Sequence, residues 1–485
     1  MASFGYFSTS KSNAHPGRGN PPHCMGKTIK RQYCRKNNSA LRPAAPPRPG
    51  HKGQNLPICM GKTIHKRLAI GSKEKMWYTY KGGKRLFSRR PWGVAHSAPA
   101  VEHILTKEVN RSMNFDMYLP FRLITGEDCI QKNAARFSEY GGRCLIVTGK
   151  HSAKASGALQ DVQAALESAG VTWILYDEVE PNPSLLGSQK AGRMARDFSA
   201  EFVVGIGGGS PLDAAKAAAV FASNEMDAMD LFNLDWPNPA LPLVLVGTTA
   251  GTGSEVGGAA VLTTPENRKK SISHTQTYPA LAFGDAKYTY SLSPQFTVST
   301  ALDALSHALE GYFATNANLV SDLFAIQAVE ILAKALPRLK GAQAAPDIAP
   351  ELREELYYAS VLAGFTLARC GTCYCHSMGY YLTENYGTPH GTACAVFLPD
   401  FIRRQTRLLP EKAARLYAKS GASADALCAV ITLLTDFTYF QVSEEAADLW
   451  ADRTINTNNA TRTAPKGYAR EEAAALIRSL FGAKS

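Results

Sequence analysis

Long apolar segments are missing from this chain. None of its apolar runs reaches the roughly 18 residues that a membrane-spanning helix needs, and the N-terminus lacks the short apolar core of a secretory signal. The 10 cysteines among 485 residues form no paired C-x-x-C framework, so a reducing compartment is favoured over a disulfide scaffold. These absences predict a cytoplasmic protein that does not bind a membrane.

Acidic residues are scarce in one part of the chain only. Residues 1–112 hold 22 of the 53 Lys and Arg residues but only 3 of the 41 Asp and Glu residues. The remaining residues carry 31 basic and 38 acidic side chains, so the overall charge of +12 belongs to the first segment. The rest of the chain is therefore a mildly acidic protein, which argues against nucleic-acid binding there.

Residues 1–112 are rich in proline, glycine and basic residues, as in 43–50. Such a composition buries too little apolar surface to offset chain entropy. Three interpretations stay open: a disordered tail, an upstream region translated from a wrongly assigned start, or an organelle transit peptide. Met113 would open a sensible chain under the second interpretation.

A short repeat within this segment contains Gly-Lys-Thr, at 24–30 and again at 59–65. A phosphate-binding loop would need another glycine five residues before the Gly of Gly-Lys. Those positions are Pro21 and Leu56, so the repeat is not interpreted as a phosphate site.

From Met113 onward, apolar strands alternate with helical patterns. Short connections between them indicate a parallel sheet with helices on both faces. The predicted strands are 143–148, 171–176, 202–205 and 241–246, and the predicted helices are 155–169, 190–198 and 211–222.

After about residue 297 the strand pattern fades and long amphipathic stretches follow. They cover 300–314, 321–336, 351–367 and 443–450. We therefore expect a Rossmann-like α/β nucleotide-binding domain over 113–297, an all-helical domain over 298–485, and a cleft between them.

Two turns follow predicted strands. Gly205–Asp213 lies between a strand and a helix, where residues without Cβ let backbone N–H groups approach a pyrophosphate at the helix N-terminus. It departs from the G-x-G-x-x-G fingerprint, so a tight structural turn is the alternative. Thr248–Glu255 clusters hydroxyls and small residues, which suits ribose and phosphate contacts or a polar loop without function.

Four residues form a candidate metal site. Asp303 and His307 are four apart and share a helix face, although such a pair is by itself more often a capping acid and a satisfied histidine. His376 and His390 add two imidazoles. From Met113 onward the chain has only five histidines, the other two being His151 and His274. One carboxylate and three imidazoles suit Fe²⁺ or Zn²⁺. Such a metal ion stabilises the alkoxide form of an alcohol while hydride passes from the alcohol carbon to a nicotinamide.

Three cysteines, Cys370, Cys373 and Cys375, precede His376. Their C-x-x-C-x-C-H spacing matches neither a haem attachment motif nor a zinc knuckle, and helical cysteines usually fill the core. We do not expect them to bind a metal.

Together these motifs resemble the iron-containing, or group III, alcohol dehydrogenase family. The resemblance runs from about Met113 to the C-terminus. It rests on 114–120 as the opening strand, 207–213 as the pyrophosphate loop, 248–255 as the second cofactor turn, 303–312 as the first metal motif, and His376 with His390 fourteen residues later.

The resemblance implies a dehydroquinate-synthase-like fold, a homodimer or larger homo-oligomer, and NAD(P)(H) as cofactor. It implies that the metal ligands are Asp303, His307, His376 and His390. The cofactor contacts that it implies are Asn182, Gly207, Gly208, Gly209, Ser210, Asp213, Thr248, Thr249, Thr252 and Lys270.

The sequence departs from the family at two places. Tyr380 stands where many members have a second histidine four residues after the one matching His376, so it is a candidate for a supporting role beside the metal. Gly149 stands where NAD-preferring relatives often place an Asp, and Lys150 and Lys154 lie nearby. NADP(H) is therefore favoured.

The sequence thus predicts a metal-dependent alcohol dehydrogenase or aldehyde reductase acting on a small molecule that it does not identify. An enzyme of the same fold without hydride chemistry, such as a cyclising lyase, is the first alternative. A nucleic-acid-binding protein that uses residues 1–112 is the second, but no recognised module accompanies the charge.

Overall fold

The structure, a computed structural model, describes residues 79–81, 84–86, 117–435 and 441–482. Within the first unit of the chain, strands β1 (Thr79–Lys81) and β2 (Lys84–Leu86) form an antiparallel pair. The predictions about residues 1–112 otherwise concern positions outside the described residues. In the part of the chain that the structure describes, no helix combines the length and the apolar character needed to cross a membrane.

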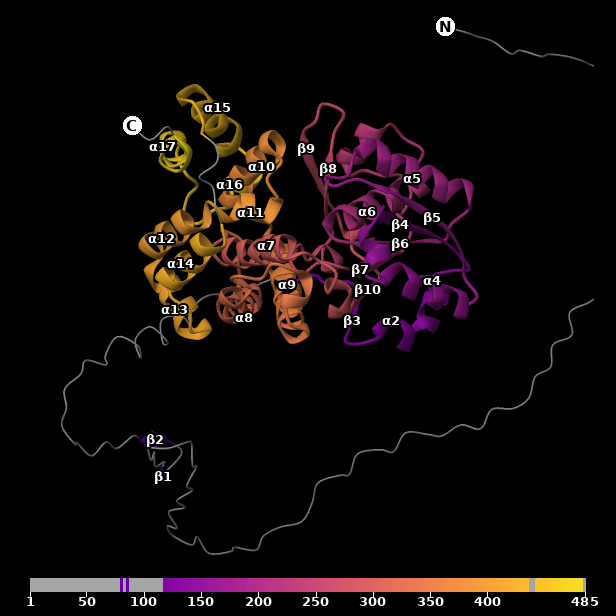
Figure 1. The fold of residues 1–485 in the computed structure, drawn as a ribbon, viewed down its shortest axis with the longest axis horizontal. Helices are drawn as coiled ribbons and strands as arrows, with labels where there is room; N and C mark the ends of the chain where they lie inside the picture. Colours follow the sequence, from indigo (N-terminus) through magenta and orange to yellow (C-terminus); the bar gives the residue numbers. More distant parts are fainter. Residues whose placement is uncertain (1–78, 82–83, 87–116, 436–440, 483–485) are drawn as a thin grey trace, which may run out of the picture. The chain divides into compact units, whose positions relative to one another are not determined.

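A six-stranded parallel sheet organises the first half of the second unit (Figure 1). Its order is β3–β10–β7–β6–β4–β5. This topology confirms the predicted parallel sheet. The bounds are β3 Arg122–Thr125, β4 Arg143–Gly149, β5 Thr172–Val179, β6 Phe202–Gly207, β7 Leu243–Gly247 and β10 Leu281–Gly284.

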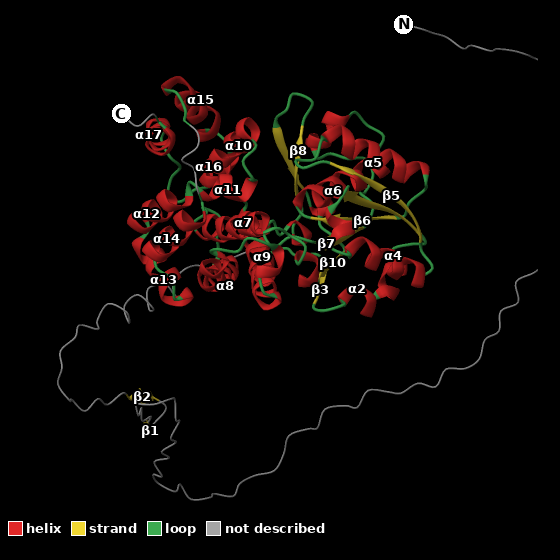
Figure 2. Cartoon of the chain, in the orientation of Figure 1, coloured by secondary structure: helices red, strands yellow, loops and turns green. Residues whose placement is uncertain are grey.

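Alternating side chains of the central strands feed two apolar layers, because successive residues of a strand point to opposite faces. Ile146 and Val204 join the layer under α4 (Ala158–Ser168). Leu145 and Val203 join the layer under α5 (Leu185–Asp197) and α6 (Gly209–Ser223). The helices therefore cover both faces of the sheet (Figure 2), as predicted.

The structure corrects two details of the sequence interpretation. The helix predicted over 155–169 is divided into α3 (Ser152–Ala155) and α4, because Gly157 adopts a left-handed conformation with φ of 80°. The opening strand is β3 rather than 114–120; residues 117–120 are not in a strand, and 114–116 lie outside the described residues. Pro120 has no N–H to donate to a sheet, which disfavours a strand there.

In the second unit, three further strands were not predicted. They are β10 at the sheet and the antiparallel pair β8 (Ala259–Thr263) and β9 (Lys269–Ser273). The β8–β9 pair carries polar residues on one face, so its pattern resembles that of a loop.

Every named element of the described chain after residue 290 is helical, as predicted. These helices share one apolar core, and Figure 1 shows them in orange to yellow beside the sheet. Their bounds are α7 Pro294–Tyr312, α8 Leu319–Ala335, α9 Pro350–Cys370, α10 Tyr374–Tyr386, α11 His390–Ala395, α12 Leu398–Leu408, α13 Pro410–Ser420, α14 Ala424–Leu434, α15 Glu444–Ile455, α16 Asn458–Thr461 and α17 Arg470–Phe481.

Helix α7 is the central helix of this part. Ser293 caps its N-terminus by accepting a hydrogen bond from the Phe296 backbone N–H, and Pro294 fits the first turn. All of its residues from Ala301 to Tyr312 are buried. Any polar side chain on this stretch therefore needs a partner inside the protein.

The close contact between α5 and α6 yields a stability prediction. A Cβ on Gly192 would lie 2.4 Å from the Phe221 Cβ and 3.0 Å from the Ala218 carbonyl oxygen. We expect Gly192→Ala to destabilise the protein by about 1–3 kcal/mol through overpacking, although alanine has the better helix propensity by about 1 kcal/mol. Urea unfolding measures the change.

Gly142→Ala is the control, since a Cβ there would approach no atom closer than 3.7 Å. A Gly192→Ala protein that is as stable as the parent would show that the helices are not in this close contact.

Candidate metal and cofactor site

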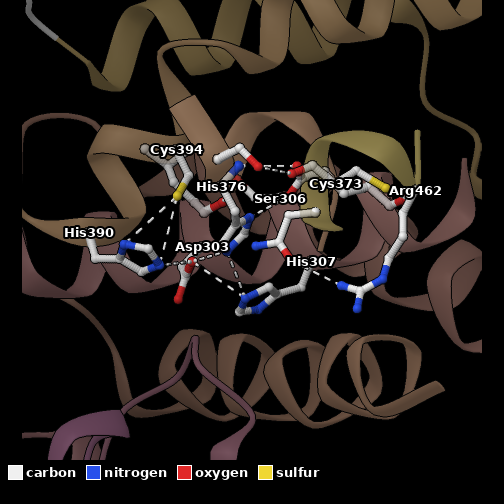
Figure 3. Close-up of polar contacts among 12 residues, drawn as sticks. Asp303, Ser306, His307, Cys373, His376, His390, Cys394 and Arg462 are labelled. Atoms are coloured by element: carbon white, nitrogen blue, oxygen red, sulfur yellow. Dashed lines mark hydrogen bonds and ion pairs between the residues drawn. The ribbon is translucent and has the colours of Figure 1, made fainter. Parts of the chain in front are cut away.

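Three helices bring four side chains to one point (Figure 3). Asp303 and His307 lie one turn apart on α7, as the four-residue spacing predicts. His376 is on the first turn of α10, and His390 is the first residue of α11.

The three imidazoles surround one carboxylate oxygen. The Oδ1 atom of Asp303 lies 3.4 Å from Nε2 of His376, 3.7 Å from Nε2 of His307 and 3.9 Å from Nε2 of His390. The Nε2 atoms of His307 and His376 are 3.0 Å apart. Ligand atoms about 2.1 Å from a tetrahedral cation are about 3.4 Å from each other, so this spacing fits a shared ion.

The cluster is buried, so its polar atoms need partners inside the protein. The side chains of Asp303 and His376 are only 4% and 2% exposed, and the Asp303 Oδ1 atom has no hydrogen-bond partner among the described residues. Burial alone would raise the pKa of Asp303, but the neighbouring imidazoles, led by His307, hold it below its usual range. Burial lowers the pKa of His307 to about 4, so this ring is neutral and can donate its lone pair.

Contacts on the far side of two rings set their orientation. Glu310, which is fully buried, contacts Nδ1 of His376 and accepts a hydrogen bond of 3.2 Å from its backbone N–H. Nδ1 of His307 lies 3.3 Å from the carbonyl oxygen of Gly251. An acceptor at Nδ1 fixes the proton there and leaves the Nε2 lone pair for a metal.

Gly391 lets α11 approach α7. A Cβ at this position would lie 1.9 Å from the Ser299 carbonyl oxygen and 2.8 Å from the Asp303 Cβ, so only glycine fits. The backbone N–H of Thr392 donates to the Ser299 hydroxyl at 3.1 Å. This close approach holds His390 within reach of Asp303.

The cluster opens on a cavity of about 460 Å³. Its wall includes residues that follow β5, β6 and β7 at their carboxyl ends, the usual ligand position in such sheets. Of the predicted cofactor residues, Asn182, Gly209, Ser210, Asp213 and Thr252 line it.

Four other predicted cofactor residues, Gly207, Gly208, Thr248 and Thr249, are not among the described residues that line the cavity. Gly207 shapes the turn instead: its φ is 151°, and a Cβ there would lie 2.5 Å from Pro211 Cγ. The pyrophosphate interpretation of this turn therefore depends on Gly209 and Ser210 at the start of α6.

Comparisons with known proteins identify the family. The family model for iron-containing alcohol dehydrogenases matches residues 120–286, and the model for the C-terminal part of that family matches 297–481. The 1,3-propanediol dehydrogenase of Klebsiella pneumoniae is 31% identical over 387 residues, which cover 76% of this chain and 99% of that protein. The chain belongs to the iron-containing alcohol dehydrogenase family.

Solved structures agree with this assignment. An iron-containing alcohol dehydrogenase from Thermotoga maritima is 35% identical with a TM-score of 0.69, covering 76% of this chain and all of that one, 100%. A sulfoacetaldehyde reductase from Bifidobacterium kashiwanohense, solved with NAD⁺, is 26% identical with a TM-score of 0.68, covering 77% and 100%. The predicted fold class is thereby confirmed.

Family membership makes the protein a metal-dependent alcohol–aldehyde oxidoreductase of the NAD-linked type, as predicted. It favours hydride transfer over the cyclising lyase that the sequence left open.

In this dehydrogenase the lysine that reaches the cavity is not the predicted one. Lys269 lines the cavity and donates to the Thr263 hydroxyl at 2.9 Å, and burial lowers its pKa to about 8. Lys270 places its Nζ 4.4 Å from the Phe232 ring centroid and is not among the described lining residues. Adjacent residues of a strand face opposite ways, so a one-residue difference changes the side of β9 that is used.

Tyr380 stacks on His390, with ring centroids 5.5 Å apart and an interplanar angle of 16°. It also lines the cavity, and burial raises its pKa to about 12. A neutral phenol therefore stands where many members of the family have a histidine.

Cys394, which the sequence motifs did not predict as a site residue, also belongs to this neighbourhood. Donor atoms of Asp303, His376, His390 and Cys394 all lie within 4.8 Å of one another. Cys370, Cys373 and Cys375 are not part of any such group in the described residues. The four-residue spacing from His390 to Cys394 is the signal that could have revealed it.

The contacts of Glu310 predict a loss of metal affinity. Glu310→Gln keeps the size of the side chain but removes the charge that holds Nδ1–H of His376. We expect the affinity for Zn²⁺ to fall about 10- to 100-fold, as measured by competition with a chromophoric chelator.

Glu330→Gln on the surface of α8 is the matched control, because Glu330 pairs only with nearby residues of its own helix. Equal zinc affinity in Glu310→Gln and in the parent would contradict the positioning role.

Proposed function

We propose that Asp303, His307, His376 and His390 together hold one divalent cation, Fe²⁺ or Zn²⁺, at the reacting centre of an NAD(P)(H)-dependent alcohol dehydrogenase. The observation that carries this proposal is the buried Oδ1 atom of Asp303, which faces three Nε2 atoms and has no hydrogen-bond partner among the described residues. A buried carboxylate in this position needs a counter-charge, and a cation at the centre of the cluster provides it.

When bound, such a cation supplies Lewis-acid stabilisation of a substrate oxygen while the nicotinamide supplies or accepts hydride. The protein's own part is to orient the rings and to exclude water. His307 and His376 are almost fully buried, whereas His390 is 35% exposed. The substrate therefore approaches from the side of His390, where the neutral phenol of Tyr380 lines the cavity.

Cofactor binding is proposed at the sheet end of the cavity. The N-terminus of α6 begins with Gly209 and Ser210, both of which line the cavity, and a helix N-terminus favours a pyrophosphate. The Ser210 hydroxyl accepts from the Asn182 backbone N–H at 3.1 Å, which links the two predicted contacts. Lys269 replaces Lys270 in this proposal.

We propose a preference for NADP(H) because of the residues Gly149 and Lys150. Gly149 ends β4 and carries no side-chain carboxylate that would repel a 2′-phosphate. Lys154 contributes less than the sequence suggested, since its Nζ forms an ion pair of 2.7 Å with Asp177.

We also propose a small alcohol or aldehyde as substrate, in line with the names of the propanediol and sulfoacetaldehyde relatives. The division into domains at 297/298, the homo-oligomeric state and the cytoplasmic location stay predictions.

Substitution of the ligands tests the proposal. We expect Asp303→Ala and His390→Ala each to abolish metal retention and turnover while the helical content stays unchanged, because each removes one of the ligands on which binding of the cation depends. Metal content, circular dichroism and reduced-nicotinamide absorbance with 1,3-propanediol and short aldehydes provide the three readouts.

His274→Ala is the control, as that ring lies against Trp236 rather than in the cluster. Full metal retention by either ligand variant would refute the assignment.

A second substitution tests the cofactor preference. Gly149→Asp places a carboxylate at the end of β4, and we expect the ratio of kcat/KM for NADPH to that for NADH to fall at least about tenfold, since two negative charges then face each other.

Gly149→Ala controls for the added Cβ, which would lie 3.2 Å from the Val179 carbonyl oxygen. A parent enzyme that already prefers NADH would overturn the proposed preference.

A further inference from the structure

Cys394 lies one helical turn after His390 on α11 and is fully buried. Its Sγ atom is 3.8 Å from Nε2 and 3.9 Å from Nδ1 of His390 (Figure 3). A sulfur almost equidistant from both ring nitrogens is aligned with neither N–H direction, so this contact is a poor hydrogen bond.

Two other buried cysteines, Cys373 and Cys428, have backbone partners. Cys373 donates to the Glu310 carbonyl oxygen at 3.4 Å, and Cys428 donates to that of Pro399 at 3.6 Å. Among the described residues, the hydrogen-bonding neighbours of Cys394 are the imidazoles of the cluster instead. Space for its sulfur is left by Gly379, where a Cβ would come within 2.9 Å of Sγ.

We infer that Cys394 presents its sulfur, as a thiolate, to the same cation that Asp303 and the three histidines hold. This inference rests on the proposed metal site. A second observation supports it: the buried Oδ1 atom of Asp303, without a hydrogen-bond partner in the described chain, points into the same space.

The spacing is compatible with a shared ion. Bonds of about 2.1 Å to nitrogen or oxygen and about 2.3 Å to sulfur keep two ligands within about 4.4 Å of each other. The sulfur meets this limit at His390, and the four donors including Asp303 and His376 lie within 4.8 Å. A movement of a few tenths of an ångström therefore brings these four donors within the limit; His307 is not in this group.

A sulfur donor makes the ligand set softer than one carboxylate and three imidazoles alone. Thiolate favours Zn²⁺ over harder cations. The parent protein should thus retain Zn²⁺ over Fe²⁺ in an equimolar anaerobic competition more strongly than a Cys394→Ala variant does.

The direct test is the absorption spectrum of the full chain loaded with Co²⁺. A thiolate bound to Co²⁺ gives a near-ultraviolet charge-transfer band, in addition to the visible bands of the ion. We expect this band in the parent and in Cys428→Ala, a matched buried cysteine, and its loss in both Cys394→Ala and Cys394→Ser. Serine keeps the size and polarity, which guards against a folding failure of the alanine variant.

The outcomes are separable. Visible Co²⁺ bands without the charge-transfer band in the parent, or a band that survives in both Cys394 variants, overturn the inference and leave the four-ligand site standing. A parent that binds no Co²⁺ overturns both the inference and the proposed function.

Discussion

The burial of one carboxylate, that of Asp303, is the constraint on which the structure of the site depends. An uncompensated charge inside a protein costs several kcal/mol, and the Oδ1 atom of this side chain is compensated by no hydrogen bond among the described residues. Three imidazoles converge on that atom from α7, α10 and α11. Glu310 orients the ring of His376, the Gly251 carbonyl orients the ring of His307, and Gly391 allows α11 to approach α7 closely.

The parallel sheet places the proposed cofactor-binding residues beside this cluster. Loops at the carboxyl ends of β5, β6 and β7 line the same cavity as the histidines. The same topology places the N-terminus of α6, where we propose that the pyrophosphate binds, at this cavity. In the proposed function, one continuous cavity holds a dinucleotide at the sheet and a cation at the helices, which is the arrangement that hydride transfer between cofactor and substrate requires.

Local periodicity was sufficient for most of the fold and for part of the site. The alternation of apolar strands and helices predicted the sheet, and the spacing of Asp303 and His307 predicted their shared face. His376 and His390 could be added because few histidines follow Met113 and because of the family resemblance. Other features depend on local conformation or tertiary contacts that periodicity does not predict. Gly157 divides a helix, and Lys269 rather than Lys270 faces the cavity because of the phase of a short polar strand. Cys394 comes close to the other donor atoms only because α11 packs against α7.

X-ray absorption spectroscopy at the metal edge of the purified full chain tests the central claim most directly. Three histidines and a carboxylate predict nitrogen and oxygen scatterers near about 2.0–2.2 Å, together with the outer-shell scattering of three imidazole rings. Asp303→Ala, which should not retain the metal, should give no metal-edge signal after the same purification. A metal surrounded only by oxygen scatterers, without imidazole rings, would contradict the claim that these four side chains hold the cation.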